Sequence, residues 1–267
     1  MVKLVIIGGG NMGEALLGGL LSSGWASAGE LVVVEPDAPR AVFVGSTYGV
    51  VVVSGLNQQL AESADHFDGA LIAVKPQMVA SVCGELSGRV NRVLSIAAGV
   101  TIASMEAALG DATPVVRCMP NTPSLVGAGA SAIAGGTHAA EIDMAWAASI
   151  LGAVGVVERV DEKLLDAVTG LSGSGPAYVF LVAEALVDGA VAQGLPRAVA
   201  VTLAHQTIAG AGKLLVEAGD QAATLRANVT SPGGTTAAGL RALESAGVRS
   251  AFIEAVAAAT QRAHDIG

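Results

Sequence analysis

The stretch KLVIIGGGNMGEALLGGL, residues 3–20, decides the fold. Its first part, KLVIIG (3–8), is an apolar run typical of a buried strand, and NMGEALLGGLLSSG (11–24) has the apolar spacing of a helix. The glycines of GGGNMG (8–13), between them, match G-x-G-x-x-G. This pattern after a strand and before a helix is typical of a dinucleotide-binding loop, in which glycines allow a tight turn, close approach of a pyrophosphate and helix–strand packing.

The next strand, LVVVE (31–35), ends in an acid that bears on the choice of cofactor. A carboxylate at Glu35 would bind the ribose hydroxyls of NAD and repel the additional phosphate of NADP. However, Asp37 and Arg40 follow, and the guanidinium of Arg40 is able to meet that phosphate. The residues therefore favour NAD. The alternatives are that the cofactor is NADP, or that Glu35 is an exposed loop acid that binds no ligand.

Further apolar runs continue the strand–helix alternation through residue 160. They are GVVVV (49–53), GALIAV (69–74), VLSIAA (93–98) and PVVRCM (114–119), with a last strand pair at ASAIAG (130–135) and GVVERV (155–160). Helical segments such as MVASVCGEL and TIASMEAAL lie between them. Nearly continuous apolar strands that alternate with helices predict an α/β fold with a doubly wound, Rossmann-type parallel sheet.

From Asp161 onward the sequence indicates helices alone. We therefore predict two domains, a dinucleotide-binding domain over residues 1–160 and an all-helical domain over residues 161–267. The helix expected at 176–194 is apolar nearly all round. Since a small helical domain cannot bury such a helix by itself, we expect a partner subunit to pack against it.

Composition excludes several classes of protein. A net charge of −9 argues against binding of nucleic acid, which requires a basic face. Polar residues interrupt every apolar run before 18 residues, so no transmembrane helix and no membrane partner is expected. Cys83 and Cys118 stand far apart and the four histidines share no motif, which predicts buried thiols, a reducing cytoplasmic location and no metal site.

Three strand ends carry residues suited to a ligand crevice. GALIAV is followed by Lys75-Pro76, VLSIAA ends at Ala97-Ala98, and PVVRCM leads into MPNTP (119–123). In an open parallel sheet the carboxyl ends of the strands line the ligand crevice. The two prolines around Asn121 predict a rigid turn that supports a flat ring, or a turn with a structural role alone.

The stretch NVTSPGGTTAAGL (228–240) predicts a second anion site. Gly233 and Gly234 allow the backbone to turn so that successive N–H groups converge, and Thr235 or Thr236 is expected to cap the following helix. With no Lys or Arg within the stretch, the site suits a small carboxylate next to a ring nitrogen. The alternative is a helix cap that serves stability alone.

In this order and spacing, GGGNMG, the VKP turn, SIAAGV, MPNTP, LSGSGPAY and NVTSPGGTT resemble pyrroline-5-carboxylate reductases over essentially the whole chain. The resemblance implies reduction of a cyclic imino acid, 1-pyrroline-5-carboxylate, to L-proline by NADPH or NADH, the last step of proline biosynthesis. It also implies a Rossmann domain and a helical domain that interlocks two subunits into a homodimer, often within a ring of dimers such as a homodecamer.

The motifs and the resemblance together give a set of expected ligand-binding residues. The cofactor is expected on Ile7, Gly8, Gly9, Gly10, Asn11, Met12, Gly13, Glu35, Asn57, Ala73, Val74, Lys75, Pro76, Ala97, Ala98, Met119 and Asn121. The substrate is expected on Asn228, Ser231, Gly234, Thr235 and Thr236, reached from the partner subunit, with Thr236 as the catalytic candidate.

Two other functions compete with this interpretation. A β-hydroxyacid dehydrogenase has a similar architecture, but it needs a proton acceptor, usually a lysine on the first long helix of the second domain; residues 176–194 contain no lysine. A dinucleotide-sensing protein without turnover would keep the glycine loop and would need no carboxylate site. NVTSPGGTT is the feature that separates the reductase from both.

Overall fold

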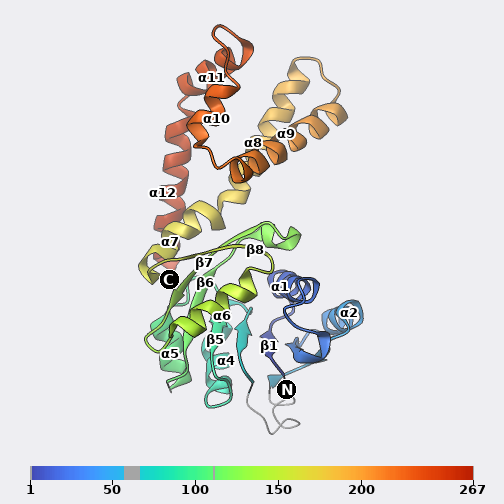
Figure 1. The fold of residues 1–267 in the computed structure, drawn as a ribbon, viewed down its shortest axis with the longest axis vertical. Coiled ribbons are helices and arrows are strands. Elements are labelled where there is room, and N and C mark those ends of the chain that lie inside the picture. Colours follow the sequence, from blue (N-terminus) through green and yellow to red (C-terminus); the bar gives the residue numbers. More distant parts are fainter. Residues whose placement is uncertain (1, 57–66, 111, 267) are drawn as a thin grey trace. The chain divides into compact units, whose positions relative to one another are not determined.

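The computed structural model describes residues 2–56, 67–110 and 112–266, and Asn57 therefore lies outside the described residues. Eight strands form one sheet in the order β3-β2-β1-β4-β5-β6-β7-β8 (Figure 1). The strands are β1 (Leu4–Ile7), β2 (Leu31–Val34), β3 (Val51–Val53), β4 (Ala70–Ile72), β5 (Val93–Ser95), β6 (Val115–Met119), β7 (Gly129–Gly135) and β8 (Gly155–Arg159). Each predicted apolar run overlaps one of them.

Helices cover both faces of the sheet, which confirms the doubly wound fold. Val5 and Ile7 of β1 face a core with α4 (Val79–Leu86), α5 (Ile102–Leu109) and α7 (Leu165–Val168). Leu4 and Ile6 face a second core with α1 (Asn11–Ser22), α2 (Ala38–Tyr48) and α6 (Glu141–Leu151). Because successive side chains of a strand point to opposite faces, a strand that is buried on both faces reads as a continuous apolar run.

The last two strands depart from the predicted all-parallel sheet. β6 pairs with β7 antiparallel, with Cys118 opposite Ile133, whereas β7 and β8 pair parallel to each other. The physical reason is the short link between β6 and β7, which contains only the 3₁₀ helix η3 (Thr122–Val126) and its flanks. A parallel return requires a crossover of a dozen or more residues, so a link this short reverses the chain.

The remaining helices follow the sheet. They are α8 (Gly175–Ala192), α9 (Arg197–Glu217), α10 (Ala222–Asn228), α11 (Thr235–Ser245) and α12 (Val248–Ile266). A π-helical turn, Thr169–Gly173, precedes α8 where the glycines of LSGSGPAY suggest a sharp turn. The chain forms two compact units, residues 1–174 with 258–267 and residues 175–257. The predicted boundary at residue 161 marks the end of the strands and stays a prediction as a domain boundary.

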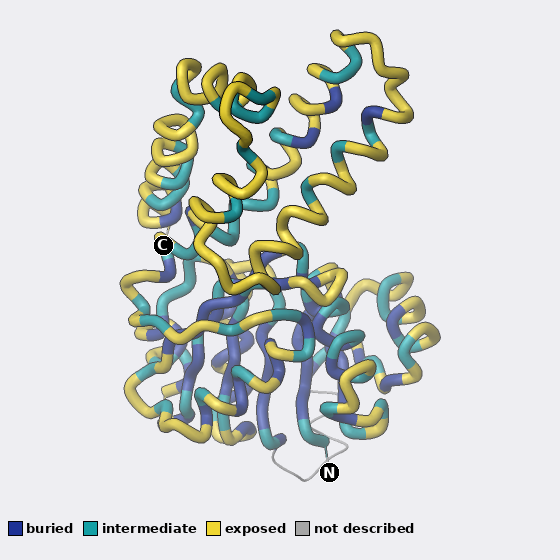
Figure 2. The backbone as a smooth tube through the Cα atoms, turned by 45° about the horizontal axis from the view of Figure 1, so that its top comes forward, coloured by how far each residue is buried: buried dark blue, intermediate teal, exposed yellow. Residues whose placement is uncertain are grey.

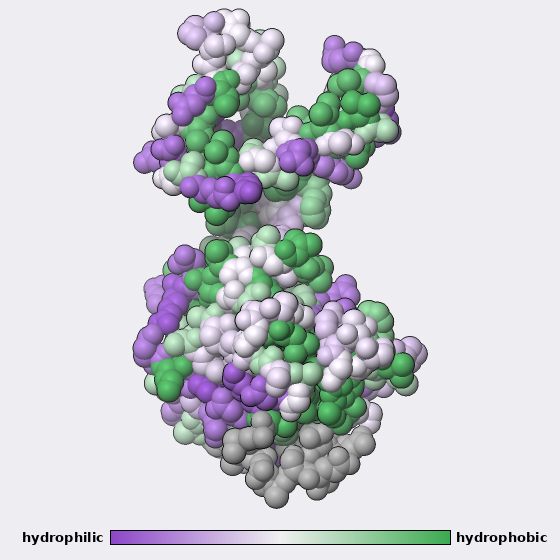
Figure 3. All heavy atoms as spheres, turned by 45° about the vertical axis from the view of Figure 1, so that its right-hand side comes forward, coloured by the Kyte–Doolittle hydropathy of each residue, from purple (hydrophilic) through white to green (hydrophobic). Residues whose placement is uncertain are grey.

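The helical unit, residues 175–257, buries little of its apolar surface. Ala183 and Val187 of α8 and Ala200 of α9 are its buried apolar residues, whereas Phe180 is 63% exposed and Val216 is 82% exposed. Figure 2 shows the residues of these helices mostly as exposed or intermediate, and Figure 3 shows apolar side chains on their surface. By length and composition alone, Glu162–Ala192 and Arg197–Glu217 would suffice to cross a membrane, a test that helices packed against other protein also meet.

Replacing Leu71 should test the sheet core. Its side chain is fully buried at the centre of β4. We expect Leu71→Ala to lower the free energy of unfolding by about 2–5 kcal/mol, because it removes buried apolar contacts and leaves a cavity. Urea denaturation at fixed protein concentration measures this, with Val156→Ala on exposed β8 as the control. A loss for Leu71→Ala no larger than the control's would contradict the assigned core.

Candidate active site

The site begins where the strand order reverses, at the carboxyl end of β1. Its neighbours are β2 on one side and β4 on the other. The ladder continues past the strands, since Gly8 N donates to Val34 O over 2.9 Å and Ala73 N donates to Ile7 O over 2.8 Å. The glycine loop, the turn after β2 and the turn after β4 therefore lie side by side, at the crevice where open α/β sheets bind ligands.

The glycines of the loop have two different roles. Gly8 has φ +107°, and a Cβ there would lie 2.5 Å from the carbonyl oxygen of Ala73. A Cβ on Gly13 would lie 2.1 Å from the carbonyl oxygen of Gly8. By contrast, a Cβ on Gly10 would meet nothing within 4 Å. Gly8 and Gly13 thus let α1 pack close to β1 and β4, whereas the absent side chain of Gly10 leaves the exposed side of the loop open to a ligand.

The first turn of α1 is suited to a phosphate group. Gly10 is its N-cap, and no side chain caps it. The first N–H groups of a helix have no partner within the helix, and their partial positive charge attracts anions. The residues that carry them include Asn11, which is exposed, and Met12, which is half-buried. Loop, helix start and glycine cradle fit the pyrophosphate of a dinucleotide.

Glu35 is held at the end of β2 by two backbone groups. Its Oε2 accepts a hydrogen bond from Gly9 N at 2.9 Å, and its Oε1 accepts one from Asp37 N at 2.9 Å. Each carboxylate oxygen has a second lone pair, so the group is still able to accept hydrogen bonds from ribose hydroxyls. The half-buried carboxylate is therefore a fixed part of the loop and no freely solvated acid.

The other predicted cofactor residues lie at neighbouring strand ends. Val74 packs its Cγ1 near Gly8, and Lys75 and Pro76 begin the 3₁₀ helix η2 (Pro76–Met78) with Lys75 exposed. A small cavity of about 20 Å³ at the ends of β5 and β6 brings together Ala97, Ala98 and Met119.

Asn121 has a structural task within the same unit. It is 8% exposed, its Oδ1 accepts from Ala130 N at 2.9 Å, and its Nδ2 donates to Ser172 O at 3.1 Å. The side chain thereby ties the turn after β6 to β7 and to the π-helical turn. Both ends of the side-chain amide bind other parts of the protein. The cofactor contact predicted at Asn121 therefore stays a prediction, and it would involve the backbone of this residue.

The second predicted site lies in the helical unit, between α10 and α11. Asn228 is the last residue of α10, and the chain turns through Gly233, at φ +71°, into Gly234, the N-cap of α11. Gly234 N donates to Ser231 O at 3.1 Å, and a Cβ on Gly234 would lie 2.3 Å from Ser231 Oγ. A side chain at 234 would thus displace the Ser231 hydroxyl, and the left-handed backbone at Gly233 favours glycine.

The structure corrects the expectation that Thr235 or Thr236 caps α11. Both lie inside the first turn, after the N-cap Gly234, and no side chain caps this helix. A capping residue must precede the first helical residue, so neither hydroxyl is placed for that task. Thr235 is exposed and Thr236 half-buried. The first N–H groups of α11 and these two hydroxyls are left for a ligand.

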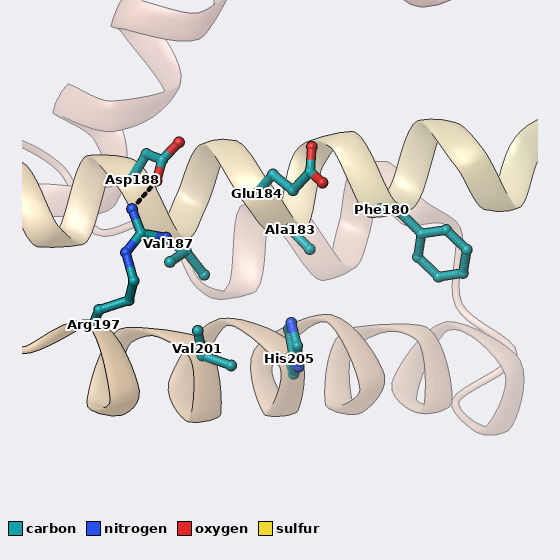
Figure 4. Close-up of a pocket in the computed structure, with 8 residues that line it drawn as sticks. All are labelled: Phe180, Ala183, Glu184, Val187, Asp188, Arg197, Val201 and His205. Carbon is teal, nitrogen blue, oxygen red and sulfur yellow. Dashed lines mark hydrogen bonds and ion pairs between the residues drawn. The ribbon is translucent and has the colours of Figure 1, made fainter.

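A larger groove lies elsewhere, between α8 and α9. Its volume is about 540 Å³, and Figure 4 shows Phe180, Ala183 and Val187 facing Val201 and His205 across it. Arg197 and Asp188 close one end with an ion pair of 2.6 Å. This groove holds none of the predicted substrate residues and is mainly apolar side chain. The glycine turns are the better candidates for chemistry because they lead into α1 and α11, whose first N–H groups no side chain caps.

The two cysteines are buried thiols, as predicted. Both are free and buried, and burial raises the pKa of the Cys83 thiol to about 11 and that of the Cys118 thiol further. Thiols with raised pKa values are poor nucleophiles at neutral pH. Among the described residues no group of three His, Cys, Asp or Glu side chains is placed to hold a metal ion.

Comparison with known proteins decides the family. The family description "Pyrroline-5-carboxylate reductase dimerisation" matches residues 162–266, and "NADP oxidoreductase coenzyme F420-dependent" matches residues 3–99. A pyrroline-5-carboxylate reductase of Synechocystis sp. is 46% identical over 100% of this chain and 98% of its own. The chain belongs to the pyrroline-5-carboxylate reductase family.

Solved structures of that family share the fold over their full length. A pyrroline-5-carboxylate reductase from Coxiella burnetii matches with a TM-score of 0.92 at 36% identity, covering 100% of this chain and 98% of that one. The Plasmodium falciparum pyrroline carboxylate reductase, solved with NADP bound, matches with a TM-score of 0.84 at 31% identity, covering 100% and 98%. This is the family that the sequence motifs resemble, and its enzymes are NAD(P)-dependent oxidoreductases.

Two glycine substitutions should separate folding from binding. Gly10→Ala fits its backbone, φ −67° and ψ −178°, and meets no atom, so we expect unchanged stability and a Kd for NADH at least about tenfold higher, equal to about 1.4 kcal/mol. The added methyl group of Gly13→Ala meets the Gly8 carbonyl oxygen. We therefore expect this variant to lower the free energy of unfolding by about 1–3 kcal/mol, in addition to weakening NADH binding. Calorimetric titration and thermal melts measure both. Unchanged NADH affinity in folded Gly10→Ala would refute the loop assignment.

Proposed function

We propose that this chain reduces 1-pyrroline-5-carboxylate to L-proline with NADH or NADPH, as its family name implies. The observation that carries the proposal is the uncapped start of α11, where Thr235 and Thr236 stand beside free N–H groups. A carboxylate fits those N–H groups, and a ring nitrogen next to it fits a hydroxyl. Among the described lysines none lies on α8, which disfavours an alcohol dehydrogenation that needs a lysine base.

The chemistry asks little acid–base work of the protein. When bound, a reduced nicotinamide would supply the hydride for the carbon of the C=N bond, and the nitrogen would take its proton from water. The first N–H groups of α11, from Thr235 onward, hold the substrate carboxylate beside Gly234, and Asn228 and Ser231 line the same turn. Thr236 positions the ring nitrogen and relays a proton, since a threonine hydroxyl does not ionise near neutral pH. Orientation of this kind is worth about 7–11 kcal/mol.

The preferred cofactor in this proposal is NADH. Glu35 stands at the position that meets the ribose, fixed by Gly9 N and Asp37 N. A carboxylate there accepts hydrogen bonds from the two ribose hydroxyls of NAD and repels a phosphate in place of one of them. Ile7 to Gly13, Ala73 to Pro76, Ala97, Ala98 and Met119 are the further cofactor contacts that the proposal assigns.

Self-association completes the proposal. Residues 162–266 match the pyrroline-5-carboxylate reductase dimerisation family, and within this range α8 and α9 expose apolar side chains suited to an interface. We assign them to the interface of an interlocked homodimer in the cytoplasm, arranged in a ring of dimers such as a homodecamer. Two helical segments are apolar enough to span a membrane. In this proposal the partner subunit buries them, because exposed apolar surface of this extent is typical of an interface.

Oxidation of the reduced cofactor, followed at 340 nm, should test the activity. We expect purified protein to consume NADH in the presence of pyrroline-5-carboxylate and to produce an equal amount of proline. The motivation is the pairing of a dinucleotide loop with a carboxylate turn in one chain. Folded protein that turns over neither NADH nor NADPH would refute the enzyme and leave a binding protein.

Thr236→Ala should separate a role in the substrate site from a role in the fold. Loss of one hydrogen bond to a charged ring nitrogen is worth about 1.5–3 kcal/mol, so we expect kcat/KM for the imine to fall about 10- to 150-fold. The Kd for NADH and the melting temperature should stay nearly unchanged, because Thr236 caps no helix.

Two variants control for packing. Thr236→Ser keeps the hydroxyl and should retain most activity, and Thr224→Ala changes an exposed threonine of α10 outside the turn. A less stable Thr236→Ala protein with unchanged kinetics would assign the hydroxyl to the fold.

A further inference from the structure

Three polar side chains beside the glycine loop form a network that the proposed function leaves unused. Arg40 Nε donates to Gly9 O at 2.6 Å, and the guanidinium also forms an ion pair with Glu14. Tyr48 OH donates to the other oxygen of Glu14 at 2.8 Å. The network connects the first turn of α1 with both ends of α2, and it fixes the guanidinium on the loop.

Arg40 is the one cation that the sequence offers between Glu35 and Tyr48. An arginine after the second strand is the side chain that accommodates the 2′-phosphate of NADP, through charge-assisted hydrogen bonds. In this structure two guanidinium nitrogens are engaged elsewhere, and the ring of Phe43 lies 5.1 Å from the guanidinium carbon. The Arg40 side chain is 26% exposed, so these partners hold it at the protein surface beside the loop.

We propose that Glu14 and Tyr48 are positioning residues for cofactor choice, which hold Arg40 on the glycine loop and so withhold it from a 2′-phosphate. The inference rests on the proposed function for the identity of the reaction. It adds to Glu35 a second device against NADPH. Glu35 repels the phosphate, and the Glu14–Arg40 pair removes the cation that would otherwise attract it.

The charge of Glu14 supports this role. Burial alone raises the pKa of its carboxyl, but hydrogen bonds from Tyr48 and Arg40 and the charge of Arg40 outweigh burial, so the pKa is lowered overall. The carboxylate is thus ionised at neutral pH and competes directly with phosphate for the guanidinium. Burial and Glu14 together raise the pKa of Tyr48, which keeps its hydroxyl a donor.

The test compares kcat/KM for NADPH and for NADH in four proteins. Glu14→Ala frees Arg40, and we expect the NADPH-to-NADH ratio to rise about tenfold, the worth of a hydrogen bond to a charged group. Arg40→Ala alone should change the ratio less than about threefold, since the parent does not offer this cation to phosphate. The double variant should return to the parent ratio, because the gain acts through Arg40.

Two more variants keep the comparison decisive. Glu14→Gln retains the side-chain volume in case Glu14→Ala unfolds, and it should raise the same ratio to a smaller extent. Glu141→Ala removes the carboxylate of an exposed ion pair with Arg159, at 2.7 Å, and should leave the ratio unchanged. A merely structural role for Glu14 would lower kcat/KM for both cofactors equally, and the ratio would not move.

The inference and the proposed function fail in different ways. A parent protein without turnover refutes the reductase, and the same variants are then compared by the ratio of Kd values for NADH and NADPH. An unchanged ratio in both Glu14 variants overturns the inference. A selective loss of NADPH use in Arg40→Ala overturns it too, since Arg40 would then already serve the phosphate in the parent.

Discussion

Gly8 and Gly13, which leave no room for a side chain, determine how closely the start of α1 packs against β1 and β4. A Cβ on Gly13 would lie 2.1 Å from the Gly8 carbonyl oxygen, and one on Gly8 would lie 2.5 Å from that of Ala73. This close approach brings the start of α1 to the point where the strand order reverses. Free N–H groups, the Glu35 carboxylate and the Arg40 guanidinium then converge on one loop, and the choice of cofactor becomes a matter of which charges face it.

Much of the fold was predictable because its central strands are buried on both faces. Each apolar run, from KLVIIG to GVVERV, became a strand. Burial on both faces leaves no polar alternation in the central strands, whereas β3 and β8 at the sheet edges are partly exposed. Strand direction was less accessible, because the reversal at β7 depends on the length of a link and apolar content says nothing of it. The helices α2 and α6 have local start signals in the sequence that the strand pattern did not draw on. In α2, for example, Asp37 Oδ1 accepts a capping hydrogen bond from Arg40 N at 2.9 Å.

The site was predictable where it depends on backbone and obscure where it depends on distant side chains. Glycine spacing identified the loop at Gly8 to Gly13 and the turn at Gly233 and Gly234. Which hydroxyl caps α11 was predicted wrongly, because the glycine itself is the N-cap. The bonds of Glu35 to Gly9 and of Tyr48 to Glu14 join residues far apart in sequence, and no local pattern encodes them.

A crystal structure of the complex with NADH would test most directly whether these charges select the cofactor. We predict the pyrophosphate about 3 Å from the first N–H groups of α1, the ribose hydroxyls on Glu35, and Arg40 still paired with Glu14 and the Gly9 carbonyl. A pyrophosphate bound away from Gly10, or Arg40 withdrawn from Glu14 to contact the adenosine ribose, would contradict this assignment.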